Sequence, residues 1–172
     1  VNKFDLSGTV SRSALNDDYK TGRGVKFYNT GYDSIDDVSL NLGVEIFPGH
    51  RIGMIYHDYD GNKLGSPGYL SKNDKDDYSD KSNKSIDFMY QGKTPKGIFS
   101  WMARYFNGID EDRWVDPTAS NPTGWDDGIA SKRKTDQQGA QAQLSFNKKR
   151  LTATAGFDWV DYDIKATWTP KK

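Results

Sequence analysis

The residues from Val38 to Ile46 alternate strictly between apolar and polar side chains. Apolar residues occupy every second position, and the positions between them hold Ser39, Asn41, Gly43 and Glu45. Successive side chains of a β-strand point to opposite faces of its sheet, so this pattern predicts a strand with one apolar and one polar face. Helical spacing of apolar residues is hard to find in the chain, and an all-β fold is therefore expected.

The same alternation recurs in other parts of the chain. It is clear over 140–146 and 151–159 and weaker over 4–10, 52–56, 86–90, 99–105 and 164–168. Together with 38–46 these segments predict about eight strands in one domain over residues 1–172. Because consecutive segments are joined by turns or loops without helical pattern, we expect an antiparallel up-and-down meander.

The connections between these segments are of two kinds. Tight turns are predicted at 48–50, 94–96 and 148–149, where Pro, Gly and Lys separate two strands. Long polar loops are predicted at about 11–37, 61–84 and 107–136, and loops of this length in a compact domain are usually functional or disordered. In a meander the tight turns then lie at one end and the long loops at the other, and the connection at 160–163 is the exception.

Charge follows the same division between the two ends. The spans 11–37, 58–80 and 107–136 hold 18 of the 24 acidic residues. The tight turns are flanked by basic residues such as Arg51, Lys93 and Lys148. Overall the chain has no net charge, which argues against a nucleic-acid binder. It has no cysteine, so disulfides and thiolate metal sites are excluded.

An apolar strand face can be covered by a soluble core or by lipid. Outer-membrane barrels combine antiparallel strands, short periplasmic turns, longer outer loops, a polar interior and aromatic girdles, and this sequence follows that pattern. No run of 18 apolar residues predicts a transmembrane helix. The face expected to point inward in a barrel is too polar for a dry core, and it includes Asp5, Glu45, Asp87, Gln91, Arg104, Gln141, Gln143 and Asp158. We therefore expect an outer-membrane β-barrel or a segment of one, with its apolar face toward lipid.

Residues 28–68 contain five short stretches that belong together as a pattern: Tyr-Asn-Thr-Gly-Tyr at 28–32, Leu-Gly-Val at 42–44, Pro-Gly-His-Arg-Ile-Gly at 48–53, Asp-Tyr-Asp at 58–60 and Gly-Ser-Pro-Gly at 65–68. This pattern resembles the early barrel strands of TonB-dependent outer-membrane receptors. The resemblance implies a transport protein of the bacterial outer membrane that takes up a scarce nutrient such as a metal chelate, siderophore or cobalamin-like compound. It also implies two partners, the membrane lipid and TonB, which would act through a plug region that this chain lacks.

Two alternatives to a receptor segment remain at this stage. The chain has no initiator Met, so it is expected to be a mature form or an excised piece. A receptor of that family has 22 strands and a plug domain, and a chain with room for about eight strands and no plug is then expected to be a piece of a larger barrel. It could instead be a complete eight-stranded structural or adhesive outer-membrane protein, since eight strands close around an interior that side chains just fill. A soluble carbohydrate-binding β domain is the third interpretation, suggested by Trp and Tyr in polar segments.

Candidate ligand-binding residues lie in the predicted loops. They are the acidic residues Asp74, Asp76, Asp77, Asp110 and Asp112, with Arg113 and Trp114 beside the last two. Asp58, Asp60 and Asn62 are a candidate metal site, because oxygen ligands at alternate positions suit Ca²⁺, although the glycine and glutamate of an EF-hand are not in place. No other cofactor is expected. His50 and His57 belong to no known catalytic motif, so we expect no enzyme activity.

Overall fold

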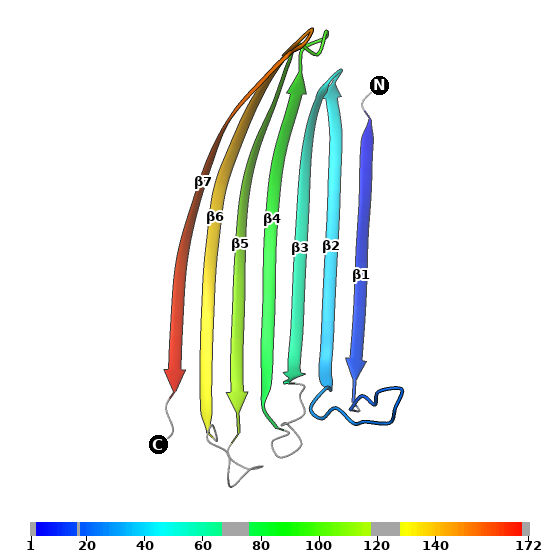
Figure 1. Ribbon diagram of the computed structural model, residues 1–172, viewed down its shortest axis with the longest axis vertical. Helices are drawn as coiled ribbons and strands as arrows, with labels where there is room; N and C mark the ends of the chain where they lie inside the picture. Colours follow the sequence, from blue (N-terminus) through cyan, green and yellow to red (C-terminus); the bar gives the residue numbers. More distant parts are fainter. Residues whose placement is uncertain (1–2, 17, 67–75, 118–127, 170–172) are drawn as a thin grey trace.

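The described residues form one sheet of β-strands (Figure 1). The computed structural model describes residues 3–16, 18–66, 76–117 and 128–169. The strands are β1 (Phe4–Leu15), β2 (Tyr32–Phe47), β3 (His50–Gly65), β4 (Tyr78–Lys93), β5 (Phe99–Asp116), β6 (Ile129–Lys148) and β7 (Leu151–Thr169). Each strand pairs antiparallel with its neighbour in sequence, in the order β1 to β7. The predicted antiparallel up-and-down meander is confirmed.

Tight turns and longer connections lie at opposite ends of the sheet (Figure 1). β2 joins β3 through Pro48 and Gly49, β4 joins β5 through 94–98, and β6 joins β7 through Lys149 and Arg150. Gly49 has a φ of 79°, in the left-handed region that glycine adopts without steric cost. We call this end of the sheet the turn end and the other the loop end. β1 begins at the turn end and β7 finishes at the loop end.

The described residues form seven strands, and the expected break at 160–163 was wrong. The predicted segments 151–159 and 164–168 are one continuous strand, β7, paired with β6 from Lys148↔Leu151 to Ala130↔Thr169. Apolar residues occupy odd positions up to Trp159 and even positions from Val160 onward. The apolar side chains therefore change face within one strand, and the interruption of the alternation looked like a turn.

The predicted loop boundaries were also wrong, because the strands extend farther toward the loop end. The connections occupy 16–31, 66–77 and 117–128, instead of 11–37, 61–84 and 107–136. Within the extensions both faces carry polar residues, as in Asp58 to Asn62 of β3. Alternation of apolar and polar residues is the signal for a strand, and a strand that is polar on both faces lacks it.

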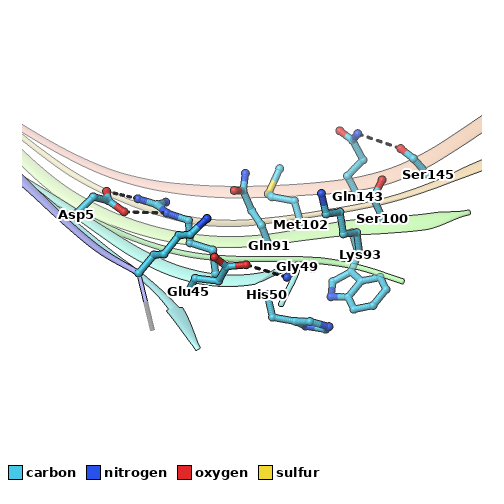
Figure 2. A pocket seen from close by; sticks show the side chains of 14 residues that line it. Asp5, Glu45, Gly49, His50, Gln91, Lys93, Ser100, Met102, Gln143 and Ser145 are labelled. Atoms are coloured by element: carbon cyan, nitrogen blue, oxygen red, sulfur yellow. Dashed lines mark hydrogen bonds and ion pairs between the residues drawn. The ribbon is translucent and has the colours of Figure 1, made fainter. Parts of the chain in front are cut away.

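The strand register collects the polar residues on one face of the sheet. One row of partners across all strands is Asp5, Gly43, Gly53, Met89, Arg104, Gln141 and Asp158. The other residues predicted to point inward, Glu45, Asp87, Gln91 and Gln143, lie an even number of positions from this row on their strands and share its face. Figure 2 shows the sheet curving around this face, with Asp5, Gln91 and Gln143 on the hollow side. We call it the concave face.

The opposite, convex face is divided into an apolar band and a charged band. Near the turn end it carries rows such as Phe4, Val44, Ile52, Tyr90, Ala103, Ala142 and Phe157. Toward the loop end it carries rows such as Arg12, Asp36, Asp60, Ser82, Glu111, Lys134 and Lys165. Of the predicted common apolar surface, Leu40 to Ile46 and Leu151 to Phe157 lie in the first band, and Val38 lies at its limit, paired with Asp58. None of the described residues forms a helix that is long and apolar enough to cross a membrane.

Candidate functional site

A polar hollow of about 600 Å³ lies on the concave face at the turn end (Figure 2). In it the Arg51 guanidinium donates to both carboxylate oxygens of Asp5, at 2.6 and 3.3 Å. Arg51 lies over Gly43, where an added Cβ would come 1.8 Å from its Nη2 atom. The absence of a side chain at Gly43 thus gives the guanidinium room to cross β2 and reach β1.

A second hollow, of about 320 Å³, lies midway along the concave face. Arg104 lines it, with Nη2 2.8 Å from Asp87 Oδ1, and donates to Gln141 Oε1 over 3.1 Å. The guanidinium carbon also lies 4.9 Å from the centre of the Phe106 ring, within cation–π distance. These contacts join β4, β5 and β6 into one polar network.

Ser39, His57 and Asp37 form a chain of polar contacts on the concave face. Ser39 Oγ lies 3.1 Å from His57 Nδ1, and His57 Nε2 lies 3.7 Å from Asp37 Oδ2. The order of residue types is that of a serine hydrolase, but acyl transfer also requires N–H donors that are free to bind an oxyanion. β2 and β3 are paired on both sides at Ser39 and His57, so their amides belong to the sheet ladder. This arrangement does not support catalysis, and the expected lack of activity stays a prediction.

A third hollow, of about 360 Å³, lies on the concave face at the loop end. It is lined by Trp114 of β5, Ser131 of β6 and Trp168 of β7, which are consecutive partners in the sheet. The next row contributes Asp112 and Arg133, whose charged atoms are 3.9 Å apart. We call this hollow the tryptophan slot.

The structure separates the predicted site residues of β5. Asp110, Asp112 and Trp114 lie on the concave face, at successive even positions of the strand. Arg113 lies on the convex face, with its Nη1 atom 3.6 Å from Asp80 Oδ2. Arg113 therefore cannot act on the same ligand as Trp114.

The predicted acidic residues before β4 belong to a different region. Asp76 and Asp77 line a hollow of about 450 Å³ that also includes Asp18, Lys26 and Asn29 of the β1–β2 connection. Asn29 donates to the backbone carbonyl of Asp77, over 2.7 Å, and to its carboxylate. Asp74 lies outside the described residues.

Asp18 and Lys26 form an ion pair across the β1–β2 connection. Lys26 Nζ lies 3.0 Å from Asp18 Oδ2, and the Thr30 amide donates to Asp18 Oδ1 over 3.3 Å. The hydrogen bond from Lys26 is the main cause that holds the pKa of Asp18 below its usual value, and burial opposes it. The ionised Asp18 carboxylate thus holds Lys26 and the Thr30 amide, and protonation of the carboxylate would weaken both contacts.

Acidification should loosen the β1–β2 connection. Because the pKa of Asp18 is lower in the folded chain than in the unfolded chain, its stabilisation is complete above the unfolded value and is lost as pH falls through the folded one. A fluorophore at Arg23→Cys should show falling anisotropy over this acid range. In the Asp18→Asn variant the β1–β2 connection should already be mobile at neutral pH, and the fall in anisotropy on acidification should be absent. The Asp33→Asn variant should keep this fall. An unchanged transition in Asp18→Asn would contradict this assignment.

The candidate metal residues are engaged with other side chains. Asp58 accepts a hydrogen bond from the Tyr56 hydroxyl over 2.8 Å and lies 3.3 Å from Lys84 Nζ. Asn62 donates to Ser34 Oγ over 3.1 Å. No group of three or more His, Asp or Glu side chains that could hold a metal ion occurs among the described residues. These contacts lend no support to Ca²⁺ binding by Asp58, Asp60 and Asn62, which stays a prediction.

Sequence reasoning missed Trp168, Arg133 and the His57 contacts as parts of the concave face. Trp168 was assigned to an eighth strand, and Arg133 was placed in a loop. The sequence signal for Trp168 and Arg133 was their spacing, because residues an even number of positions apart on one strand lie on the same face. Trp168 is ten residues from Asp158, and Arg133 is eight residues from Gln141. This spacing becomes informative once β6 and β7 are known to be continuous.

No protein-family model, curated protein or solved structure matches the chain. Its function is therefore argued from the geometry of the sheet and its two faces.

Proposed function

We propose that the chain is part of the wall of an outer-membrane β-barrel, in a receptor of the TonB-dependent type that takes up a scarce nutrient. The observation that carries the membrane part of this proposal is the border on the convex face between apolar and charged residues. Along β7 it falls between Trp159 and Asp161, along β3 between Tyr56 and Asp58, and along β4 between Ile86 and Lys84. Tyr56 and Ile86 are direct partners, so the border is level on β3 and β4. On β7 it lies one row nearer the turn end, because the row of Tyr56 and Ile86 ends at Asp161.

The height of the apolar band supports this location. On β7 the band runs from Leu151 to Trp159, at every second position. A tilted transmembrane strand needs about 9–11 residues, which this span provides. The remainder of each strand would stand beyond the lipid, where ion pairs such as Lys132 Nζ–Glu111 Oε2, at 2.9 Å, face water.

Aromatic side chains mark both limits of the apolar band. At the turn end the His50 ring centroid lies 4.2 Å from that of Phe47 and 5.4 Å from that of Trp101. At the border with the charged band the convex face carries Tyr105 and Trp159, which are 43% and 44% exposed. Aromatic girdles at the two interfaces are typical of outer-membrane barrels.

The direction of the edge strands favours a piece of a larger barrel over a complete small one. β1 and β7 both run from the turn end to the loop end, because seven antiparallel strands place the first and last in the same direction. Joining them directly would create a parallel pair. A fully antiparallel barrel that contains this sheet therefore needs further strands between β7 and β1.

A soluble carbohydrate-binding domain fits the sheet less well. The apolar band leaves large side chains exposed on one face, including Leu6 at 59%, Phe88 at 46% and Phe157 at 62%. Contiguous exposed apolar patches beyond a few hundred Å² are rare in soluble monomers. Lipid covers such a face in a barrel wall.

Nutrient uptake and the action of TonB follow from the resemblance of residues 28–68 alone. In such a receptor the concave face would border the lumen, and the loop end would face the medium from which the nutrient arrives. The encoding gene tests this part: a plug-coding region upstream in the same reading frame supports a receptor. A start codon directly before Val1 and a stop codon directly after Lys172 would contradict it.

Single-cysteine labelling tests the membrane location. The chain has no native cysteine, so a fluorophore can be attached at one chosen position. In lipid vesicles, a fluorophore at Leu40→Cys, Leu42→Cys or Val44→Cys should be quenched by a quencher on the lipid tails. A fluorophore at Ser39→Cys or Asn41→Cys, on the concave face, should not be quenched. A fluorophore at Asp36→Cys, in the charged band, should not be quenched either. Equal quenching at 41 and 42, or at 36 and 42, would contradict the proposal.

A further inference from the structure

We infer that the tryptophan slot binds an uncharged ring of a ligand that carries several hydroxyl or amide groups, with Trp114 and Trp168 as stacking surfaces. This inference rests on the proposed function and narrows the nutrient class. It favours a saccharide or an amide-bearing macrocycle over an anionic ferric chelate. Four features of the concave face carry it.

The first feature is the spacing of the two tryptophans. Trp114 pairs with Ser131, and Ser131 pairs with Trp168, so the tryptophans lie on the same face of the sheet, two strands apart. Neighbouring strands are about 4.8 Å apart, which separates the two backbones by about 10 Å. A ring in van der Waals contact with two flat surfaces needs about 7–8 Å between them. The small side chain of Ser131 leaves the intervening floor open.

The second feature is an unsatisfied acceptor in the slot. Asp112 Oδ1 is buried and has no hydrogen-bond partner among the described residues. Buried polar atoms nearly always have a partner, and one without it calls for an explanation. Asp112 Oδ1 has no accessible surface as it stands, so a ligand hydroxyl or amide N–H group would donate to it after a rotation of the carboxylate toward the slot. An anionic chelate oxygen would be repelled by the same carboxylate.

The third feature is the charge balance of the concave face from mid-sheet to the loop end. The register places Lys81, Arg104 and Arg133 there, and even spacing from Gly53 adds Lys63 of β3. Each lies within 4 Å of a carboxylate: Lys63 by Asp33, Lys81 by Asp112, Arg104 by Asp87, and Arg133 by both Asp110 and Asp112. An anionic ligand would have to compete with these carboxylates, so a neutral ligand is favoured.

The fourth feature is the surface below the slot. The mid-sheet hollow is lined largely by amide and hydroxyl side chains, including Asn83, Ser85, Thr135, Gln137 and Gln141. Such groups both donate and accept hydrogen bonds, as do sugar hydroxyls and carboxamides. The charged residues Asp87, Arg104 and Asp110 also line this hollow. The concave face therefore offers a polar path, rich in amide and hydroxyl groups, that continues from the slot toward the turn end.

Equilibrium dialysis against the chain in lipid vesicles tests the inference with three probes. Maltohexaose is a neutral saccharide, cyanocobalamin is an amide-bearing macrocycle, and a ferric tris-catecholate is an anionic chelate. At least one neutral probe should bind weakly, with a dissociation constant on the order of 1 mM because an open sheet holds only one side of it. The catecholate should bind at least tenfold more weakly. The neutral probe that binds shows whether the ring belongs to a saccharide or to an amide-bearing macrocycle.

Matched tryptophan variants assign the binding to the slot. Trp114→Ala and Trp168→Ala should each lower the affinity about five- to tenfold through the loss of stacking. Trp168→Phe should retain most of it. Trp159→Ala is the control, because it removes a tryptophan from the convex face of the same edge strand and should leave the affinity unchanged.

The quenching pattern of the cysteine variants separates the two proposals. If that pattern is as expected but neither neutral probe binds, or the catecholate binds best, the ligand inference is wrong and the membrane assignment stands. An equal loss of affinity in Trp159→Ala also overturns the slot. If the quenching pattern itself fails, the proposed function is wrong, whatever the probes do.

Discussion

Replacing Leu42 by arginine is expected to lower the free energy of unfolding in a lipid bilayer by about 2–4 kcal/mol. Leu42 lies on the convex face, between Leu6 of β1 and Met54 of β3, in the middle of the apolar band. In a barrel wall this position faces the hydrocarbon core, where a guanidinium loses its hydration. Urea titration of the chain in lipid vesicles, followed by the circular dichroism of the sheet, measures the effect.

Asn41→Arg is the matched control for this substitution. Asn41 is the adjacent residue on β2, on the concave face between Ser7 and Ile55. The same charge there would face an aqueous lumen, and a change within about 0.5 kcal/mol is expected, as for other surface substitutions. Similar losses at both positions would contradict a lipid-covered convex face.

The sequence predicted the strands that have one apolar face and missed the parts that have none. From Val38 to Ile46 apolar and polar residues alternate along the chain, so both the strand and the face on which each side chain lies could be derived. In Asp58 to Asn62, or Asp110 to Trp114, polar residues occupy both faces, and the hydrophobic pattern gives no period. What keeps these segments extended is the pairing with their neighbours, which depends on residues far away in the sequence.

The candidate site was predicted only in part, because it too lies in strand segments with polar residues on both faces. Asp112 and Trp114 were identified, but they were read as a loop cluster together with Arg113. In a strand, Arg113 must lie on the opposite face from its neighbours, and its partner is Asp80 of β4. Trp168 could not be placed beside Trp114 without the register of β5, β6 and β7, which no local pattern reveals.

Gly139→Ala is expected to lower the free energy of unfolding by about 1–3 kcal/mol, as overpacking does elsewhere. An added Cβ would lie 2.4 Å from Phe106 Cζ and 2.7 Å from the backbone oxygen of Trp159. The Phe106 ring cannot turn away freely, because it packs under Arg104, which Asp87 and Gln141 hold in place. The backbone oxygen belongs to the β6–β7 ladder and is equally restrained.

Gly108→Ala is the control for Gly139→Ala, because Gly108 lies on the same face one strand away and its Cβ would approach no atom closer than 3.4 Å. Little change in the urea midpoint is expected there. In a Phe106→Ala background the cost of Gly139→Ala should fall, since one of the two close contacts is gone, but the contact with the Trp159 oxygen should remain. A double-mutant cycle of Gly139→Ala and Phe106→Ala isolates the part of the loss in unfolding free energy that is due to the Phe106 ring. If the cost of Gly139→Ala were the same with and without Phe106, the packing of this ring over the glycine would not limit the residue at position 139.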